Sequence, residues 1–321
     1  MKRWSILILW WLSACGWAAN LARGRPEWRT IGKSPSSYGL AAQRVDFESA
    51  DHLRVAAWWI AGTPSRREIA SVPPADACEL SIRGGGGRAT VVLVHGVGGN
   101  RGGMLARAQF LVAHGYNALS IDLRAHGESE GAYPSPGYLE AAEVQAAVAE
   151  ATRHSPCPVV LLGHSVGGVA VLHAASHHPA IAGVVADSAF VSSFDMFDRL
   201  RDRLRRNGAS VWPRMGLWFL GRRSLAGMID TLVQWGGGPD IDARKGELVP
   251  VLPAIDVPVM FVTGTSDDIA PSANTHAMAR LVRRARVVEL AATHFTYDDA
   301  PHDYESAVLG FLSEILTRKP I

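Results

Sequence analysis

Cysteine is scarce in this chain of 321 residues, which has only Cys15, Cys78 and Cys157. They form no CxxC pair and no Cys/His spacing typical of a metal site, so zinc is not expected. The chain also lacks an excess of basic charge, because 32 Lys and Arg residues stand against 30 Asp and Glu residues, for a net charge of +2. Without a basic stripe, nucleic acid is not an expected partner.

Arginine is nevertheless concentrated in two segments, residues 199–206 and 280–286. Such clusters are usually solvated helix faces, and contact with a membrane surface or an anionic substrate is the alternative. No internal repeat is present. The length and the apolar content of 48% are typical of one large α/β unit with a substantial core.

The first 22 residues differ in character from the rest. Lys2 and Arg3 precede an uncharged run over residues 4–22, the pattern of an export signal, and the run is close to the length that spans a bilayer. Within it, the sequence LSAC at residues 12–15 resembles the bacterial lipobox, in which the cysteine is lipidated and becomes the new N-terminus. Lipidation of Cys15 is therefore the favoured prediction, with an uncleaved anchor or a cleaved signal as alternatives.

Residues 23–43 are polar and contain Pro, Gly and Ser, which is typical of a tether. Together these segments predict an exported protein that contacts the membrane through its N-terminus. It would be anchored on the outer side of the bacterial inner membrane, or lie in the periplasm or at the outer membrane.

From residue 44 to 321 the pattern predicts one α/β domain. Residues 44–49 and 53–61 read as a strand pair. Short apolar strands then alternate with helices, which indicates a mostly parallel sheet covered on both faces. The expected strands are residues 90–95, 118–122, 158–163, 181–187, 258–263 and 286–290. The expected helices are residues 104–114, 138–154, 166–178, 272–284 and 301–317. Residues 190–255 break the rhythm with many aromatics, Gly and Pro, and are expected to form an inserted helical cap.

The motif GHSVG at residues 163–167 fits G-x-S-x-G and stands between an expected strand and an expected helix. That context is the nucleophile elbow, a sharp strained turn whose flanking residues must be small. Ser165 is therefore the candidate nucleophile, held at the positive end of a helix. The alternative is a glycine-rich helix cap that contains a serine without a catalytic role.

A serine nucleophile needs a base, and the base needs an orienting acid, each on a loop after a later strand. The loop after residues 258–263 carries Asp267, with Asp268 as the weaker alternative. The loop after residues 286–290 carries His294 as the candidate base. His302 competes less well because it lies at the start of the final helix. Asp187, which ends its own strand, is a further alternative acid.

The oxyanion hole requires two backbone N–H donors. Val166 follows the nucleophile and supplies one of them. The loop HGVGGN at residues 95–100 supplies the other, and Val97 is the expected donor. Gly98 and Gly99 permit close approach of the backbone to a ligand, although a plain glycine turn would contain them as well.

The chain from about residue 44 resembles the esterase/lipase and serine-aminopeptidase-like branch of the α/β-hydrolase superfamily. The matching segments are VHG at residues 94–96, DLRAHGES at 122–129, GHSVGG at 163–168, residues 264–271, and THF at 293–295. In the second of these, Ala125 stands where the family has glycine. The resemblance implies the α/β-hydrolase fold, and it implies that Asp122, His126 and His164 are structural residues that brace the elbow.

These features predict a serine hydrolase that cleaves carboxylic esters of a small-molecule acyl substrate, without a metal or cofactor. A peptidase or thioesterase would use the same residues, because fold and triad do not name a substrate. A catalytically inactive binding or scaffold protein is less favoured, since no triad or oxyanion position is replaced.

Cys78 and Cys157 each precede a core strand. In an oxidising compartment, with Cys15 consumed by lipid, they would form an even pair suited to a disulfide. Two separate thiols are the alternative.

Overall fold

The computed structural model describes residues 29–62, 78, 87–176, 180–192, 196, 199 and 246–317. Their centre is an eight-stranded sheet in the order β1-β2-β4-β3-β5-β6-β7-β8. The strands are β1 (Gln43–Glu48), β2 (Arg54–Ile60), β3 (Thr90–Val94), β4 (Asn117–Ile121), β5 (Val159–His164), β6 (Ile181–Asp187), β7 (Val259–Gly264) and β8 (Ala285–Leu290). Strand β2 pairs antiparallel with β1 and β4. The six strands β4, β3, β5, β6, β7 and β8, in their order across the sheet, run parallel.

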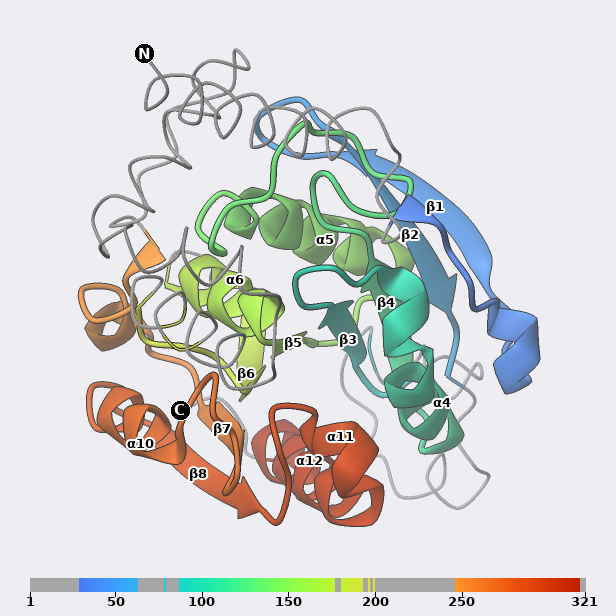
Figure 1. Cartoon of the computed structure of the whole chain (residues 1–321). Coiled ribbons are helices and arrows are strands. Elements are labelled where there is room, and N and C mark those ends of the chain that lie inside the picture. Colours follow the sequence, from blue (N-terminus) through green and yellow to red (C-terminus); the bar gives the residue numbers. More distant parts are fainter. Residues whose placement is uncertain are drawn as a thin grey trace, which may run out of the picture.

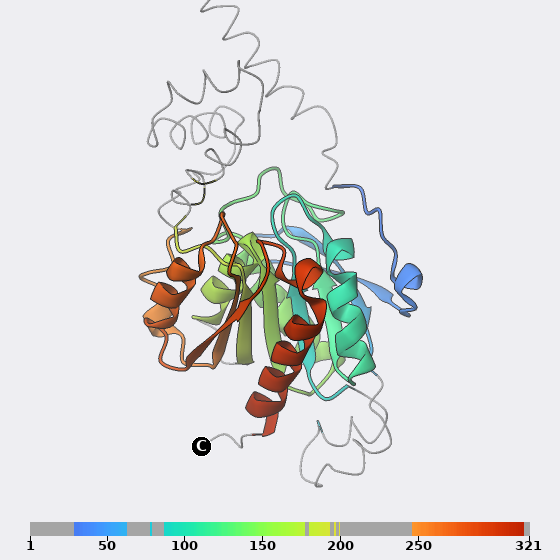
Figure 2. The ribbon, with the colours of Figure 1, turned by 60° about the horizontal axis from the view of Figure 1, so that its bottom comes forward.

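Helices cover both faces of this sheet (Figures 1 and 2). The helices are α4 (Leu105–Ala113), α5 (Ala141–His154), α6 (Val166–Ala175), α10 (Ser272–Ala279), α11 (Thr296–Asp299) and α12 (Pro301–Thr317), with short 3₁₀ turns at Pro35–Tyr38, Arg101–Met104 and Leu252–Ala254. One core cluster joins α5, α6 and α10 to the sheet, and the other joins α4 and α12 to its opposite face. Since β3 is buried along its whole length, its run of apolar residues follows from two-sided coverage.

The prediction of a mostly parallel α/β sheet is confirmed. Four helices are shorter than expected: α4 by one residue at each end, α6 because it ends at Ala175 and not at residue 178, and also α5 and α10. Helix α5 begins at Ala141 and not at residue 138, because the buried Glu140 carboxylate accepts hydrogen bonds from the Ser135 and Gly137 amides at 2.5 and 3.1 Å and shapes a turn there. Helix α10 ends at Ala279 and not at residue 284, where bonds such as Leu281 N–H to Met278 carbonyl tighten the chain into turns.

Cys78 and Cys157 are joined in a disulfide, with their Cα atoms 4.6 Å apart. Of the two alternatives that the sequence leaves open, pairing is thus confirmed, and separate thiols are wrong. Cys157 lies two residues before β5 and is buried. The bridge therefore ties residue 78 to the amino end of the strand that leads to Ser165.

The N-terminal signal or anchor over residues 1–22, including Cys15, lies outside the described residues. So does most of the predicted cap at residues 190–255. Part of the predicted tether is described and contacts the domain: Arg29 donates to the Gly131 carbonyl at 2.8 Å, and Gln109 donates to the Tyr38 carbonyl at 2.8 Å. No helix in the described part of the chain has both the length and the apolar character needed to cross a bilayer.

Candidate active site

Ser165 lies at the sharp turn between β5 and α6. Its backbone is strained, with φ +55° and ψ −118°, a conformation that is costly for a residue with a side chain. The turn is possible because its neighbours are glycines. A Cβ atom on Gly163 would lie 2.1 Å from the Gly167 carbonyl oxygen, and one on Gly167 would lie 2.4 Å from the Val94 carbonyl oxygen. The glycines of the GHSVG motif therefore follow from the packing of the elbow itself.

Ser165, His294 and Asp267 form one chain of hydrogen bonds. The Ser165 Oγ lies 3.0 Å from His294 Nε2, and His294 Nδ1 lies 2.8 Å from Asp267 Oδ2. All three residues are buried. Because a carboxylate only accepts hydrogen bonds, Nδ1 carries the proton, and Nε2 is left to accept the hydroxyl proton of Ser165. This tautomer is the one that a general base acting on serine requires.

Asp267 is held by its own loop after β7. Its Oδ1 accepts the amides of Ile269 and Ala270 at 2.9 and 2.8 Å, which leaves Oδ2 for His294. The neighbouring Asp268 is exposed. The structure therefore brings Asp267, and not Asp268, to the imidazole.

His294 lies on the loop after β8, which packs directly on the loop of Asp267. A Cβ atom on Gly264 would lie 2.2 Å from the Thr293 carbonyl oxygen, and the Ser266 amide donates to the Ala292 carbonyl at 2.9 Å. The competitor His302 is exposed at the start of α12.

Two backbone amides lie beside Ser165. Val166 is the first residue of α6, where an N–H has no partner within the helix. Val97 follows Gly96, on which a Cβ atom would lie 3.1 Å from the Ser165 Cβ. Among the described residues, neither amide donates to an acceptor. An amide without an acceptor is a requirement of the predicted oxyanion hole.

Asp187, the alternative acid, is bonded elsewhere. Its carboxylate accepts hydrogen bonds from three side chains, those of Arg107 at 3.1 Å, His164 at 3.1 Å and Thr296 at 2.5 Å. Burial alone would raise the pKa of Asp187, but His164 and Arg107 outweigh it and hold this pKa well below its usual range. Asp187 is thus a charged, fully paired group beneath the elbow. Arg107 was not predicted as a functional residue, because its one signal in the sequence is a lone charge on the apolar face of an expected helix.

Asp122 is also a structural anchor. It accepts hydrogen bonds from the Arg101 guanidinium, from the Arg101 amide at 2.6 Å and from the Glu128 amide at 2.9 Å. These bonds join the loop after β3 to the loop after β4.

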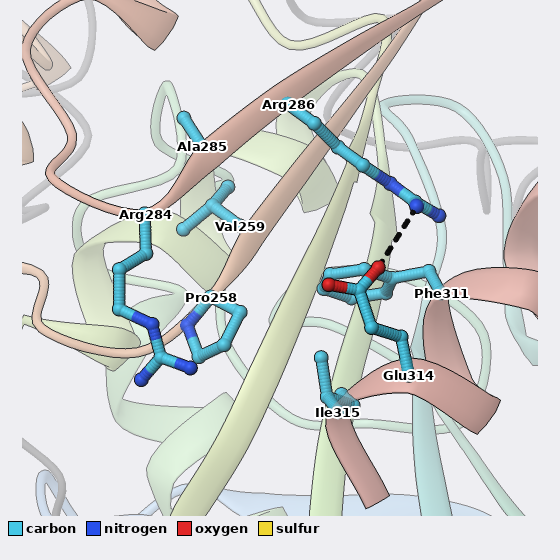
Figure 3. Close-up of a pocket in the computed structure, with 8 residues that line it drawn as sticks. All are labelled: Pro258, Val259, Arg284, Ala285, Arg286, Phe311, Glu314 and Ile315. Carbon is cyan, nitrogen blue, oxygen red and sulfur yellow. Dashed lines mark hydrogen bonds and ion pairs between the residues drawn. The ribbon is translucent and has the colours of Figure 1, made fainter. Parts of the chain in front are cut away.

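A separate pocket of about 250 Å³ lies at the amino ends of β7 and β8, beside α12 (Figure 3). Arg286 and Glu314 form an ion pair of 3.3 Å across it. No serine, cysteine or histidine lines this pocket, and it lies at the end of the strands opposite to Ser165. It is not part of the candidate active site.

Comparisons with known proteins agree with this fold. A family model described as "Alpha/beta hydrolase family" matches residues 91–307, more than half of the chain. An uncharacterized protein, YqkD, of Bacillus subtilis (strain 168) is 27% identical over 70% of this chain and 72% of its own length. A pimeloyl-[acyl-carrier protein] methyl ester esterase of Xanthomonas oryzae pv. oryzae (strain MAFF 311018) is 29% identical over 63% of this chain and 85% of its own.

Among solved structures, an esterase of Pyrococcus furiosus superposes with a TM-score of 0.67 at 20% identity, over 89% of this chain and 96% of that one. At that identity the likeness shows the fold. The family match, the eight-stranded sheet and the strand-turn-helix at Ser165 all agree, and the chain is a member of the alpha/beta hydrolase family.

Proposed function

We propose that the protein is a serine esterase that forms an acyl-enzyme on Ser165. The observation that carries this proposal is the chain of hydrogen bonds from Asp267 through His294 to Ser165, at 2.8 and 3.0 Å. His294 removes the hydroxyl proton as Ser165 attacks the acyl carbon, and Asp267 stabilises the imidazolium that results. The Val97 and Val166 amides donate to the oxyanion. His294 then protonates the leaving alcohol and activates a water molecule that releases the acid.

A carboxylic ester is the favoured substrate, because the methyl ester esterase is among the chain's relatives. The same residues could act on an amide or a thioester, so the test compares all three bonds. Matched esters, thioesters and anilides of graded acyl length should be hydrolysed with the highest kcat/KM for the esters. A higher kcat/KM for the amides or the thioesters would replace the ester assignment.

Ser165→Ala and His294→Ala should each lower kcat by about 10⁴-fold or more, since the residues act as a unit. A fluorophosphonate probe should label the wild-type protein at Ser165 and leave Ser165→Ala unlabelled. Asp268→Asn is the matched control for Asp267→Asn, which should lose about 10⁴-fold because the wrong histidine tautomer is favoured. Full activity in Ser165→Ala would refute the proposal.

We also propose that the protein is exported and anchored by lipid at Cys15. The disulfide between Cys78 and Cys157 supports export, because such bonds persist in oxidising compartments. A lipidated cysteine carries more than one acyl chain, as stable anchoring requires. Intact-mass analysis of the mature protein should find an N-terminus at Cys15 with added acyl mass. An unlipidated N-terminus near Ala19 or Asn20 would contradict lipidation, and one at Met1 would indicate an uncleaved anchor.

A further inference from the structure

The Val97 amide belongs to the peptide group that joins Gly96 to Val97. The carbonyl oxygen of that group accepts two hydrogen bonds, from His95 Nδ1–H at 2.8 Å and from the Gly99 amide at 3.1 Å. No described peptide bond is cis. In a planar trans peptide the N–H points away from the carbonyl oxygen. Whatever fixes the Gly96 carbonyl therefore also fixes the direction of the Val97 N–H.

The next peptide group, which joins Val97 to Gly98, is held by a second imidazole. The Gly98 amide donates to His126 Nε2 at 3.2 Å. Gly98 has φ +73°, a left-handed conformation that glycine adopts without strain. With glycines at positions 96, 98 and 99, the loop has little conformational preference of its own, so its shape depends on these outside contacts.

Both imidazoles are themselves held by the loop after β4. His95 Nε2 accepts the Leu123 amide at 3.1 Å, and His126 Nδ1–H donates to the Arg124 carbonyl at 2.7 Å. These partners assign the same tautomer to both rings, with the proton on Nδ1. Burial lowers the pKa of His95 to about 3 and also lowers the pKa of His126. Both rings are therefore neutral near neutral pH, and each keeps one donor and one acceptor.

We propose that His95 and His126 are positioning residues of the oxyanion hole, which set the direction of the Val97 amide from its two sides. The proposal rests on the proposed function. The segment at residues 122–129 was expected to brace the elbow. The proposal gives it a second role, in which it also holds the oxyanion loop through the imidazoles of His95 and His126. His95 also polarises the peptide, because a carbonyl that accepts hydrogen bonds makes its own N–H a stronger donor.

Isosteric amides separate these contacts. The side-chain nitrogen of asparagine can occupy the place of histidine Nδ1, and the end of glutamine can occupy the place of Nε2. His95→Asn keeps the donor to Gly96, whereas His95→Gln loses it. His126→Gln keeps the acceptor for Gly98, whereas His126→Asn loses it. Each site thus offers one variant that preserves the contact with the oxyanion loop and one that removes it.

The readout is the ratio of kcat for an ester to kcat for the matching thionoester, whose sulfur is a poor hydrogen-bond acceptor. Removing a whole oxyanion donor costs about 10²–10³-fold in kcat. Misdirecting one should cost less, so we expect His95→Gln and His126→Asn to lower the ratio by about 10- to 100-fold, with KM nearly unchanged. His95→Asn and His126→Gln should keep most of the wild-type ratio.

The assay is run below the melting temperature of every variant and normalised to the sites labelled by a fluorophosphonate. An unchanged ratio in His95→Gln and His126→Asn, even with reduced stability, would overturn the proposal and leave the two residues a purely structural role. If one site does not tolerate substitution, the pair at the other site decides. Failure of the probe to label wild-type Ser165 would instead refute the esterase assignment itself.

Discussion

At the scale of single residues, Ala125 has a strained backbone at a position where the family resemblance leads us to expect glycine. Its φ is +60°, in the left-handed region, and the residue is buried in the loop after β4. A side chain in that region costs the folded chain roughly 1–2 kcal/mol, and glycine avoids this cost. Part of the gain is lost because glycine gives the unfolded chain more conformational freedom. Ala125→Gly should therefore raise the free energy of unfolding by roughly 0.5–1 kcal/mol.

Guanidinium unfolding measures that change. The matched control is Ala149→Gly, on the exposed face of α5, where the same substitution should cost about 1 kcal/mol. Destabilisation of similar size at both positions would show that the backbone of Ala125 is not strained.

His95 couples stability to pH. Its pKa is about 3 in the folded chain, against an ordinary value of 6.5 that the unfolded chain recovers. Between these values the unfolded chain binds more protons, so stability is complete above pH 6.5 and is lost as the pH falls. From pH 7 to pH 5 this one group should cost about 2 kcal/mol.

His95→Asn should therefore lose about 2 kcal/mol less than the wild type between the same two pH values, measured by urea unfolding. His302→Gln, at the exposed start of α12, is the matched control for removal of an imidazole. Equal losses in the wild type and in His95→Asn would contradict the pKa assigned to His95.

Sequence reasoning locates residues whose role depends on their position along the chain. Ser165, Asp267 and His294 each follow an expected strand, and the structure brings them together. Arg107 and His95 were missed as functional groups because their roles depend on partners far away. Arg107 pairs with Asp187 across 80 residues, and His95 meets Leu123 across 28. Nothing local distinguishes such a residue from a solvated charge or a buried polar side chain.

At the scale of elements, the loops after β7 and β8 are packed backbone to backbone at Gly264. Gly264→Ala would place a methyl group against the Thr293 and Ala292 carbonyls, at 2.2 and 2.4 Å. The loop of His294 would have to move away from Asp267, so we expect kcat to fall by about 10²-fold, the loss typical of a misplacement near 1 Å. Steady-state kinetics on an activated ester measures this loss.

Gly310→Ala is the matched control, since nothing lies within 4 Å of a Cβ atom at that position in α12. There the methyl group should leave kcat unchanged and raise stability by roughly 0.5–1 kcal/mol. Wild-type kcat in Gly264→Ala would mean that the two loops can separate without disturbing the triad.

The central strands were predictable because burial on both faces makes them short and largely apolar, as β3 and β5 are. The ends of the helices were less predictable from the sequence. The start of α5 depends on the Glu140 carboxylate, which turns back onto residues 135 and 137. That contact is a matter of side-chain geometry, which hydrophobic periodicity does not encode.

At the scale of the whole molecule, the disulfide closes a loop with a sequence separation of 79 residues. By loop-closure entropy it should contribute roughly 4–5 kcal/mol to stability. The double variant Cys78→Ser and Cys157→Ser should lose about that much in guanidinium unfolding. It should keep its kcat below its melting temperature, because Cys157 lies at the end of β5 opposite to Ser165. Equal stability with and without the bridge would contradict this.

The pairing itself could not be decided from the sequence, because it depends on how the fold places two distant residues. Spacing along the chain allowed both alternatives, and the 4.6 Å between the two Cα atoms is a property of the assembled domain.

The disulfide also divides the catalytic parts between two covalent regions. The ring from Cys78 to Cys157 contains Val97, His95 and His126, and therefore one proposed oxyanion donor and its two proposed positioning residues. Ser165, Asp267 and His294 all lie outside the ring. A single proteolytic cut within the ring would leave one covalent molecule, with no piece released. The oxidised protein could thus be nicked and stay one covalent molecule, whereas reduction after a cut between residues 100 and 157 would leave the loop at residues 95–100 and Ser165 on separate chains.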